Sequence, residues 1–141
     1  MKIITLCIAV LLVVGLSFTV LRGGASARAA APSTRHGKLF HVVSLKFKPS
    51  ATKDQIRAVE DAFAALKEKI PGVTSLDWGT NVSPEKHDKG FTHCFVLSFA
   101  TEKDRDAYLP HPAHKAFGKV LGPVMEDVMV IDFWSQGGER Q

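Results

Sequence analysis

The residues best suited to acid–base chemistry lie in one short stretch of the chain. Tyr108, His111 and His114 place a phenol and two imidazoles within seven residues, and Pro110 and Pro112 stiffen the backbone between them. Few other side chains exchange protons near neutral pH, so this stretch is where the sequence predicts catalysis, if the protein has any. The alternative is structural: a proline-rich connection between two helices carries surface histidines that cap or brace the joint.

The elements that would position these side chains follow from two periodicities. At residues 39–47 and 91–99, large apolar side chains alternate with smaller or polar ones, as in strands with one well-buried face. After the capping-box spacing Thr52-Lys-Asp-Gln55, apolar residues recur at steps of three and four up to residue 70, which predicts an amphipathic helix over 52–70. The other predicted elements are a strand at 73–78, a polar loop at 81–89, a short helix from Thr101 that carries Tyr108, a helix at 113–121 and a strand at 128–134.

This order of strand, helix, strand, strand, helix, strand predicts an α+β, ferredoxin-like βαββαβ domain with one antiparallel sheet. Helices cover only one face of such a sheet, so the other face must be buried against something else. The alternation places modest side chains on that second face: Val42, Ser44, Thr92, Cys94, Val96 and Ser98. A second copy of the sheet would fit there, and the sequence therefore predicts a homodimer.

Two further histidines lie within the predicted strands. His41 and His93 each sit among large apolar side chains on the face toward the helices. If the first and third strands pair antiparallel, these residues lie toward opposite ends of the sheet, so they are not expected to share one site. The alternative for either is a core histidine whose ring nitrogens are satisfied by neighbours. Asp132, in the apolar last strand, would orient a histidine or pair across the dimer.

The N-terminal residues have the composition of an export signal. An uncharged apolar run at 3–21 is followed by Arg22-Gly-Gly and by Ala25-Ser-Ala27, a pattern that signal peptidases cleave. We therefore predict a signal peptide at 1–27 and a periplasmic or secreted protein. The run has 19 residues, close to the roughly 20 that span a bilayer, so an uncleaved segment would be a membrane anchor. We predict a flexible linker at 28–38, the domain at 39–135 and a flexible tail at 136–141.

Charge and cysteine content argue against several kinds of function. The formal net charge is +4, but without Lys2 and Arg22 of the predicted signal 16 basic residues face 14 acidic ones, which leaves +2. So small an excess is no argument for a nucleic-acid partner, and none is predicted. With Cys7 in the signal, Cys94 is alone in the domain and forms no internal disulfide. The sequence has no CxxC or HExxH motif, and we predict neither a metal site nor a cofactor.

Three motifs together resemble one known family. The segments His41-Val-Val-Ser-Leu-Lys-Phe47, Gly90-Phe-Thr-His93 and Tyr108-x-x-His111-Pro-Ala-His114-x-x-Phe117 resemble the stress-responsive dimeric α/β-barrel domain, called Dabb. The resemblance runs from about Phe40 to Trp134, nearly the whole predicted domain. It implies the fold derived above, with the sheets of two copies joining into a barrel.

The resemblance also implies which residues form a site. The family that the chain resembles includes a plant polyketide cyclase that works without a cofactor. Similarity to that enzyme implies catalytic roles for His114 and Tyr108. His114 would take a proton from a carbon beside a carbonyl, and Tyr108 would position that base or donate to the carbonyl oxygen. The pocket would lie between helices and sheet, lined by Tyr108, His114 and one of His41 or His93. The implied substrate-binding residues are His41, His93, His111 and Phe117.

Three functions remain open at this point. The first is a stress-associated module that binds a small apolar molecule without catalysis. The second is a cofactor-free cyclase or lyase that abstracts a proton next to a carbonyl. The third, related by fold, is a cofactor-independent monooxygenase or a haem-binding enzyme, which would need a histidine able to ligate iron from an open pocket.

Overall fold

The computed structural model describes residues 37–136. The predicted signal peptide at 1–27 lies outside the described residues. The same holds for the predicted linker at 28–38 except its last two residues, and for the predicted tail at 136–141 except Gln136. Within the described part of the chain, no helix is long and apolar enough to cross a membrane.

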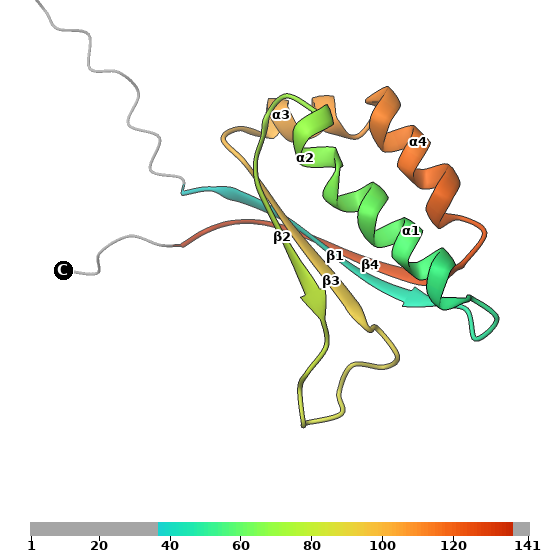
Figure 1. Cartoon of the computed structure of the whole chain (residues 1–141). Coiled ribbons are helices and arrows are strands. Elements are labelled where there is room, and N and C mark those ends of the chain that lie inside the picture. The colour runs from blue at the N-terminus through green and yellow to red at the C-terminus, as the bar shows by residue number, and fades with distance from the viewer. Residues whose placement is uncertain (1–36, 137–141) are drawn as a thin grey trace, which may run out of the picture. The chain divides into compact units, whose positions relative to one another are not determined.

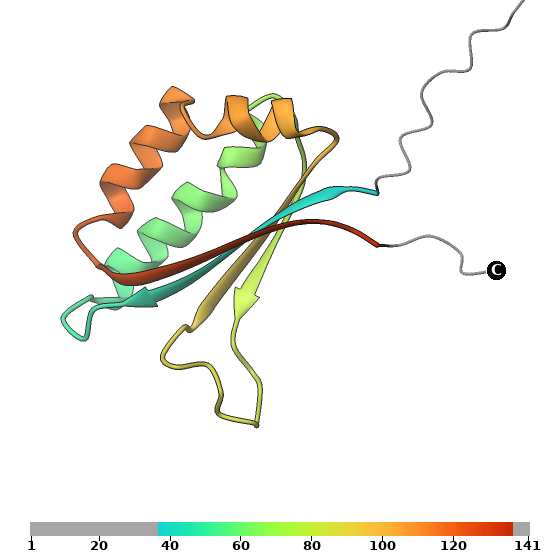
Figure 2. The same ribbon diagram turned by 180° about the vertical axis from the view of Figure 1, so that it is seen from behind.

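The elements follow the predicted order. They are β1 (Leu39–Phe47), α1 (Lys53–Ala64), α2 (Leu66–Lys69), β2 (Val73–Thr80), β3 (His93–Phe99), α3 (Glu102–Tyr108), α4 (Pro112–Leu121) and β4 (Met125–Trp134). The strands form one antiparallel sheet with the order β2-β3-β1-β4. The helices lie on one face of this sheet (Figures 1 and 2). This arrangement confirms the ferredoxin-like α+β fold.

Backbone hydrogen bonds set two strand boundaries that differ from the prediction. The strand predicted from residue 91 begins at His93, because the Phe91 N–H donates to the Asp88 carbonyl at 2.9 Å and keeps that segment in a turn. The last strand begins at Met125, earlier than predicted, because its pairing with β1 continues beyond a register shift. Both corrections concern the ends of elements and leave the topology unchanged.

The first helix begins where its capping residues predict. Thr52 Oγ1 accepts from the Gln55 N–H at 3.3 Å, and Gln55 Oε1 accepts from the Thr52 N–H at 2.9 Å. The single helix predicted over 52–70 is instead divided at Ala65 into α1 and α2. Gly72 follows with a φ of +96°, a conformation that L-residues rarely adopt, and the chain turns there into β2.

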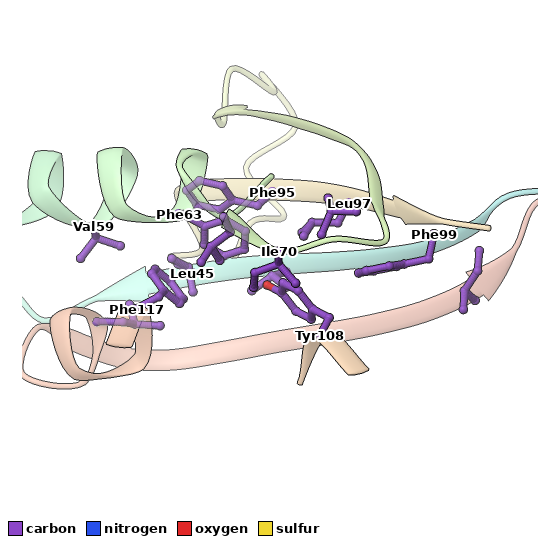
Figure 3. Close-up of a cluster of buried hydrophobic side chains, with 14 of the residues drawn as sticks. Leu45, Val59, Phe63, Ile70, Phe95, Leu97, Phe99, Tyr108 and Phe117 are labelled. Carbon is purple, nitrogen blue, oxygen red and sulfur yellow. The ribbon is translucent and has the colours of Figure 1, made fainter. Parts of the chain in front are cut away.

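The hydrophobic core lies between the sheet and the helices (Figure 3). Phe63 of α1 stacks on Phe95 of β3 with ring centroids 3.9 Å apart, and its ring lies 4.7 Å from that of Phe117 in α4. Tyr108, at the end of α3, belongs to the same cluster. The other core residues are Leu39, Val43, Leu45, Val59, Leu66, Ile70, Val73, Leu97, Phe99, Leu121 and Val124.

The opposite face of the sheet, called here the open face, has no helix over it (Figure 2). Met129, Ile131 and Phe133 of β4 lie on this face and are 43%, 47% and 46% exposed, although all three are large and apolar. Ser98, predicted on the same face, is fully buried, and its hydroxyl is hydrogen-bonded to the hydroxyls of Thr74 and Ser75. The other open-face residues include Phe40, Val42, Ser44, Cys94 and Val96. Contiguous exposed apolar surface of this kind is uncommon on monomeric soluble proteins.

Candidate functional site

The ring of Tyr108 lies at the centre of the candidate site. Its residue is 0% exposed, and Figure 3 shows it within the buried cluster. The ring centroids of His114 and His41 lie 4.6 Å and 5.7 Å from that of Tyr108. The hydroxyl has no hydrogen-bond partner among residues 37–136. Burial raises the pKa of Tyr108, so the phenol stays protonated and is a buried donor without an acceptor.

His114 reaches Tyr108 through the proline-rich joint between α3 and α4. His111 caps α4, where its Nδ1 accepts from the Ala113 N–H at 3.1 Å, and Pro112 is the first helical residue. His114 Nδ1 donates to the Leu109 carbonyl at 3.0 Å. A carbonyl only accepts, so the neutral ring carries its proton on Nδ1 and its lone pair on Nε2.

The protonation state of His114 suits a base. Burial lowers the pKa of His114; the hydrogen bond to the Leu109 carbonyl opposes this effect, and the charge that His41 carries whenever it is protonated adds to it. The net shift is downward, so the imidazole is neutral at neutral pH. His114 therefore has an unprotonated Nε2, and its ring lies beside that of Tyr108.

His41 is held by a carboxylate that the sheet register places next to it. His41 of β1 is the pairing partner of Asp132 in β4, and its Nδ1 donates to Asp132 Oδ1 at 2.6 Å. Arg105 of α3 donates from Nη1 to the other oxygen, Asp132 Oδ2, at 2.8 Å. Burial raises the pKa of Asp132, but the hydrogen bonds from His41 and Arg105 outweigh it and hold that pKa below its ordinary value.

These contacts define a Tyr108 cluster, made of Tyr108, His41 and His114. The Nε2 atoms of both imidazoles, like the Tyr108 hydroxyl, lack a hydrogen-bond partner within the described residues. Three side chains able to give or take a proton thus have their rings in contact. Buried polar groups are normally satisfied, and the Tyr108 hydroxyl is the one buried side-chain atom among residues 37–136 that departs from this rule.

His93 lies outside the cluster. It pairs with Leu45, whereas His41 pairs with Leu97, so the two histidines are separated by four residues along the strands, or about 13 Å at about 3.3 Å per residue. Its ring nitrogens have their own partners: Nδ1 lies 2.8 Å from Thr92 Oγ1 and Nε2 lies 3.0 Å from Glu60 Oε1. Of the two strand histidines, the structure therefore brings only His41 to Tyr108.

The two other residues implied as substrate-binding lie at the edge of the cluster. His111 serves as the cap of α4, and Nδ1 is the atom that this role uses. Phe117 is buried, and its ring centroid lies 6.3 Å from that of His114. Arg105 was missed by the sequence analysis. Its only signal in the sequence is a position three residues before Tyr108 on a predicted helix.

A separate cavity of about 680 Å³ lies on the open face of the sheet. Its floor includes Ser44, Cys94 and Met129, and its wall includes His87 and Phe91 from the loop between β2 and β3. No residue of the Tyr108 cluster lines it. The loop extends from the end of the sheet away from α3 (Figure 1), so this cavity and the cluster are on different faces and toward different ends. Within residues 37–136, no group of histidine, cysteine and acidic side chains could hold a metal ion.

A family model described as the stress responsive A/B barrel domain, Dabb, matches residues 39–135. This chain belongs to the Dabb family. The match confirms the resemblance found in the three sequence motifs, and it spans every strand and helix of the described fold.

Two relatives of this Dabb protein have names that state an activity or a biological response. Olivetolic acid cyclase from Cannabis sativa is 29% identical over 93 residues, which are 66% of this chain and 92% of the cyclase. The stress-response A/B barrel domain-containing protein HS1 from Arabidopsis thaliana is 30% identical over 97 residues, which are 69% of this chain and 89% of HS1. The family therefore includes a protein named as an enzyme and a protein named for a stress response.

Solved structures agree with the fold. The structure of At3g17210 from Arabidopsis thaliana is 28% identical with a TM-score of 0.67, over 72% of this chain and 98% of that chain. A protein from Jannaschia sp., described as dimeric and ferredoxin-like, is 26% identical with a TM-score of 0.61, over 69% of this chain and 98% of its own. A dimer is thus a property of a structural neighbour of this Dabb protein.

Proposed function

We propose that this Dabb protein is a homodimer that uses Tyr108 and His114 as a cofactor-free acid–base pair on a small apolar carbonyl compound. The observation that carries the proposal is the fully buried Tyr108 hydroxyl, which lacks a partner among residues 37–136 beside two imidazoles. An unsatisfied buried hydroxyl costs about 1–3 kcal/mol, which a purely structural residue has no reason to bear. Similarity to a protein named as a cyclase supports the same class of chemistry.

The proposed step is proton transfer at a carbon next to a carbonyl. Nε2 of His114 takes the proton, and the electron pair of the broken C–H bond moves toward the carbonyl oxygen to form an enolate. Tyr108 donates its hydroxyl proton in a hydrogen bond to that oxygen, where the negative charge develops. Because the Tyr108 hydroxyl is enclosed, ligand entry requires a displacement of α3 or of the joint before α4.

Proton abstraction can be tested before a natural substrate is known. In heavy water, the protein is expected to accelerate deuterium exchange next to the carbonyl of apolar ketones, with methyl heptyl ketone and benzylacetone as probes. Because burial lowers the pKa of the His114 base, the rate should rise with pH along an acid limb centred below 6.5 and then become flat. Burial raises the pKa of Tyr108, so Tyr108 adds no basic limb below pH 10.

The exchange rate is followed by mass spectrometry over a pH series. His114→Gln should lower the rate about 10²–10⁴-fold, the usual contribution of a general base, and remove the acid limb. Exchange no faster than in buffer for both ketones at every pH would contradict the proposal.

The open-face cavity supports a second candidate function, binding of an apolar ligand without catalysis. A volume of about 680 Å³ is within the usual range for small-molecule sites. Its floor carries the short side chains of Ser44 and Cys94. Cys94→Phe should therefore weaken binding of the fluorescent probe anilinonaphthalene sulfonate at least about 10-fold, the loss from about 1.4 kcal/mol. Equal binding by Cys94→Phe would argue against this site, and Tyr108→Phe serves as the control on the other face.

Two further parts of the proposal concern assembly and location. The open face with its exposed apolar residues on β4 supports a homodimer, as does the dimeric neighbour. The apolar run at 3–21 and the small-residue pattern up to Ala27 support export, or anchoring in a membrane if the segment is not cleaved.

A further inference from the structure

We infer that Arg105 is a positioning residue of the Tyr108 cluster, which acts on His41 through Asp132; the inference rests on the acid–base function proposed above. Two hydrogen bonds connect Arg105, through Asp132, to the buried imidazole ring of His41. Arg105 Nη1 lies 2.8 Å from Asp132 Oδ2, and Asp132 Oδ1 lies 2.6 Å from His41 Nδ1. The side chains of Arg105 and Asp132 are 22% and 30% exposed, whereas that of His41 is only 7% exposed.

Asp132 determines which nitrogen of His41 carries the proton. A carboxylate accepts hydrogen bonds, so Nδ1 of His41 is the donor and Nε2 remains on the side without a protein partner. In Ser-His-Asp triads the carboxylate has this orienting role, and its replacement by an amide lowers kcat about 10⁴-fold because the tautomer is wrong. The His41 ring so oriented is the one in edge contact with Tyr108 at 5.7 Å.

Arg105 determines where that carboxylate points. Asp132 lies on the edge strand β4, where a carboxylate without a second partner would turn toward water. The guanidinium holds one oxygen while the other faces His41, and its own plane is fixed by Asp106, whose Oδ1 accepts from Nε at 3.0 Å and from Nη2 at 2.9 Å. Ion pairs this accessible contribute little to stability, so orientation is the effect that remains.

The short helix α3 therefore carries two residues of the site. Arg105 and Tyr108 are three residues apart in α3, a spacing that places them on the same side of a helix. Packing of α3 on the sheet places the phenol of Tyr108 in the core. It also places Arg105 against Asp132, which in turn holds the imidazole of His41.

The test compares Arg105→Met with Lys103→Met in the full-length chain. Lys103 is exposed on the same helix and forms no hydrogen bond or ion pair among residues 37–136, so its replacement removes the same charge without touching Asp132. Long-range ¹H–¹⁵N NMR spectra show which ring nitrogen of His41 carries the proton. We expect Arg105→Met to change the spectrum from Nδ1–H alone to a mixture of tautomers, and Lys103→Met to leave it unchanged. With benzylacetone, kcat for exchange should fall up to about 100-fold with little change in KM, because the His41 ring contacts the catalytic Tyr108 and a small misplacement of a catalytic group costs that much.

The conservative variant separates positioning from packing. Arg105→Lys keeps a cation within reach of Asp132 and should restore most of the Nδ1–H signal and of kcat. An unchanged His41 tautomer in folded Arg105→Met would overturn the inference. If the wild-type protein exchanges no ketone, the acid–base proposal fails, but the NMR comparison still decides whether Arg105 orients His41.

Discussion

Tyr108→Phe is expected to lower the rate of ketone exchange about 10²–10⁴-fold while the free energy of unfolding stays the same or rises. The two effects have one cause. The hydroxyl is fully buried without a partner among residues 37–136, so the folded protein loses no hydrogen bond when it is removed. The phenyl ring keeps the contacts with Phe99, His41 and His114. A residue needed only for packing would not show the loss of rate.

Ser98→Ala is the matched control for that variant. Ser98 is also 0% exposed, but its hydroxyl lies 2.7 Å from Thr74 Oγ1 and is bonded to Ser75 as well. Removing it breaks satisfied hydrogen bonds, so we expect a loss of about 1 kcal/mol in the free energy of unfolding and an unchanged exchange rate. Urea denaturation and the exchange assay measure both variants. If Tyr108→Phe destabilises the protein as Ser98→Ala does and retains its rate, Tyr108 is a structural residue.

Ile131→Asp is expected to dissociate the proposed homodimer. Ile131 is 47% exposed on the open face, between Met129 and Phe133, so a facing copy would bury it. An uncompensated charge in such an interface costs about 3–5 kcal/mol, which corresponds to a Kd raised about 10²–10³-fold or more. Light scattering during gel filtration should show a dimer for the wild-type protein and a monomer for the variant at micromolar concentration.

Val120→Asp provides the comparison for the dimer. Val120 is similar in size and 40% exposed, but it belongs to α4 on the helix side of the sheet. Its replacement adds the same charge to the same chain and should leave the dimer intact. Dissociation by Val120→Asp but not by Ile131→Asp would place the interface on the helices and refute a sheet-to-sheet dimer.

Much of the fold was predictable because local sequence patterns determine local structure. The alternation over residues 93–99 specifies a strand with one buried face, since a period of two places every second side chain on the same side. Thr52 and Gln55 specify the start of α1 by bonding its free N–H groups. The break at Ala65 and the turn at Phe91 were not predictable, because they depend on competing backbone hydrogen bonds rather than on side-chain pattern.

The candidate site, too, was predictable from the sequence only in part. The sequence by itself determined that Tyr108 and His114 are neighbours, because a short proline-rich joint limits the distance between them. It also predicted that His41 and His93 lie too far apart along antiparallel strands to share one site. Which of the two joins Tyr108 was decided only by the packing of α3 on the sheet. The pairing of β1 with β4 brings together residues separated by 91 positions, His41 and Asp132, and the packing of α3 adds Arg105.

The face of the sheet on which the cavity lies was likewise decided only by tertiary structure. The sequence placed a pocket between helices and sheet, but the described cavity lies on the open face over Ser44 and Cys94. Whether side chains fill a space depends on the volumes of groups from several strands and loops at once, and periodicity in one segment carries no information about that sum. Periodicity determines which face a side chain occupies, and only the assembled layers determine what meets it there.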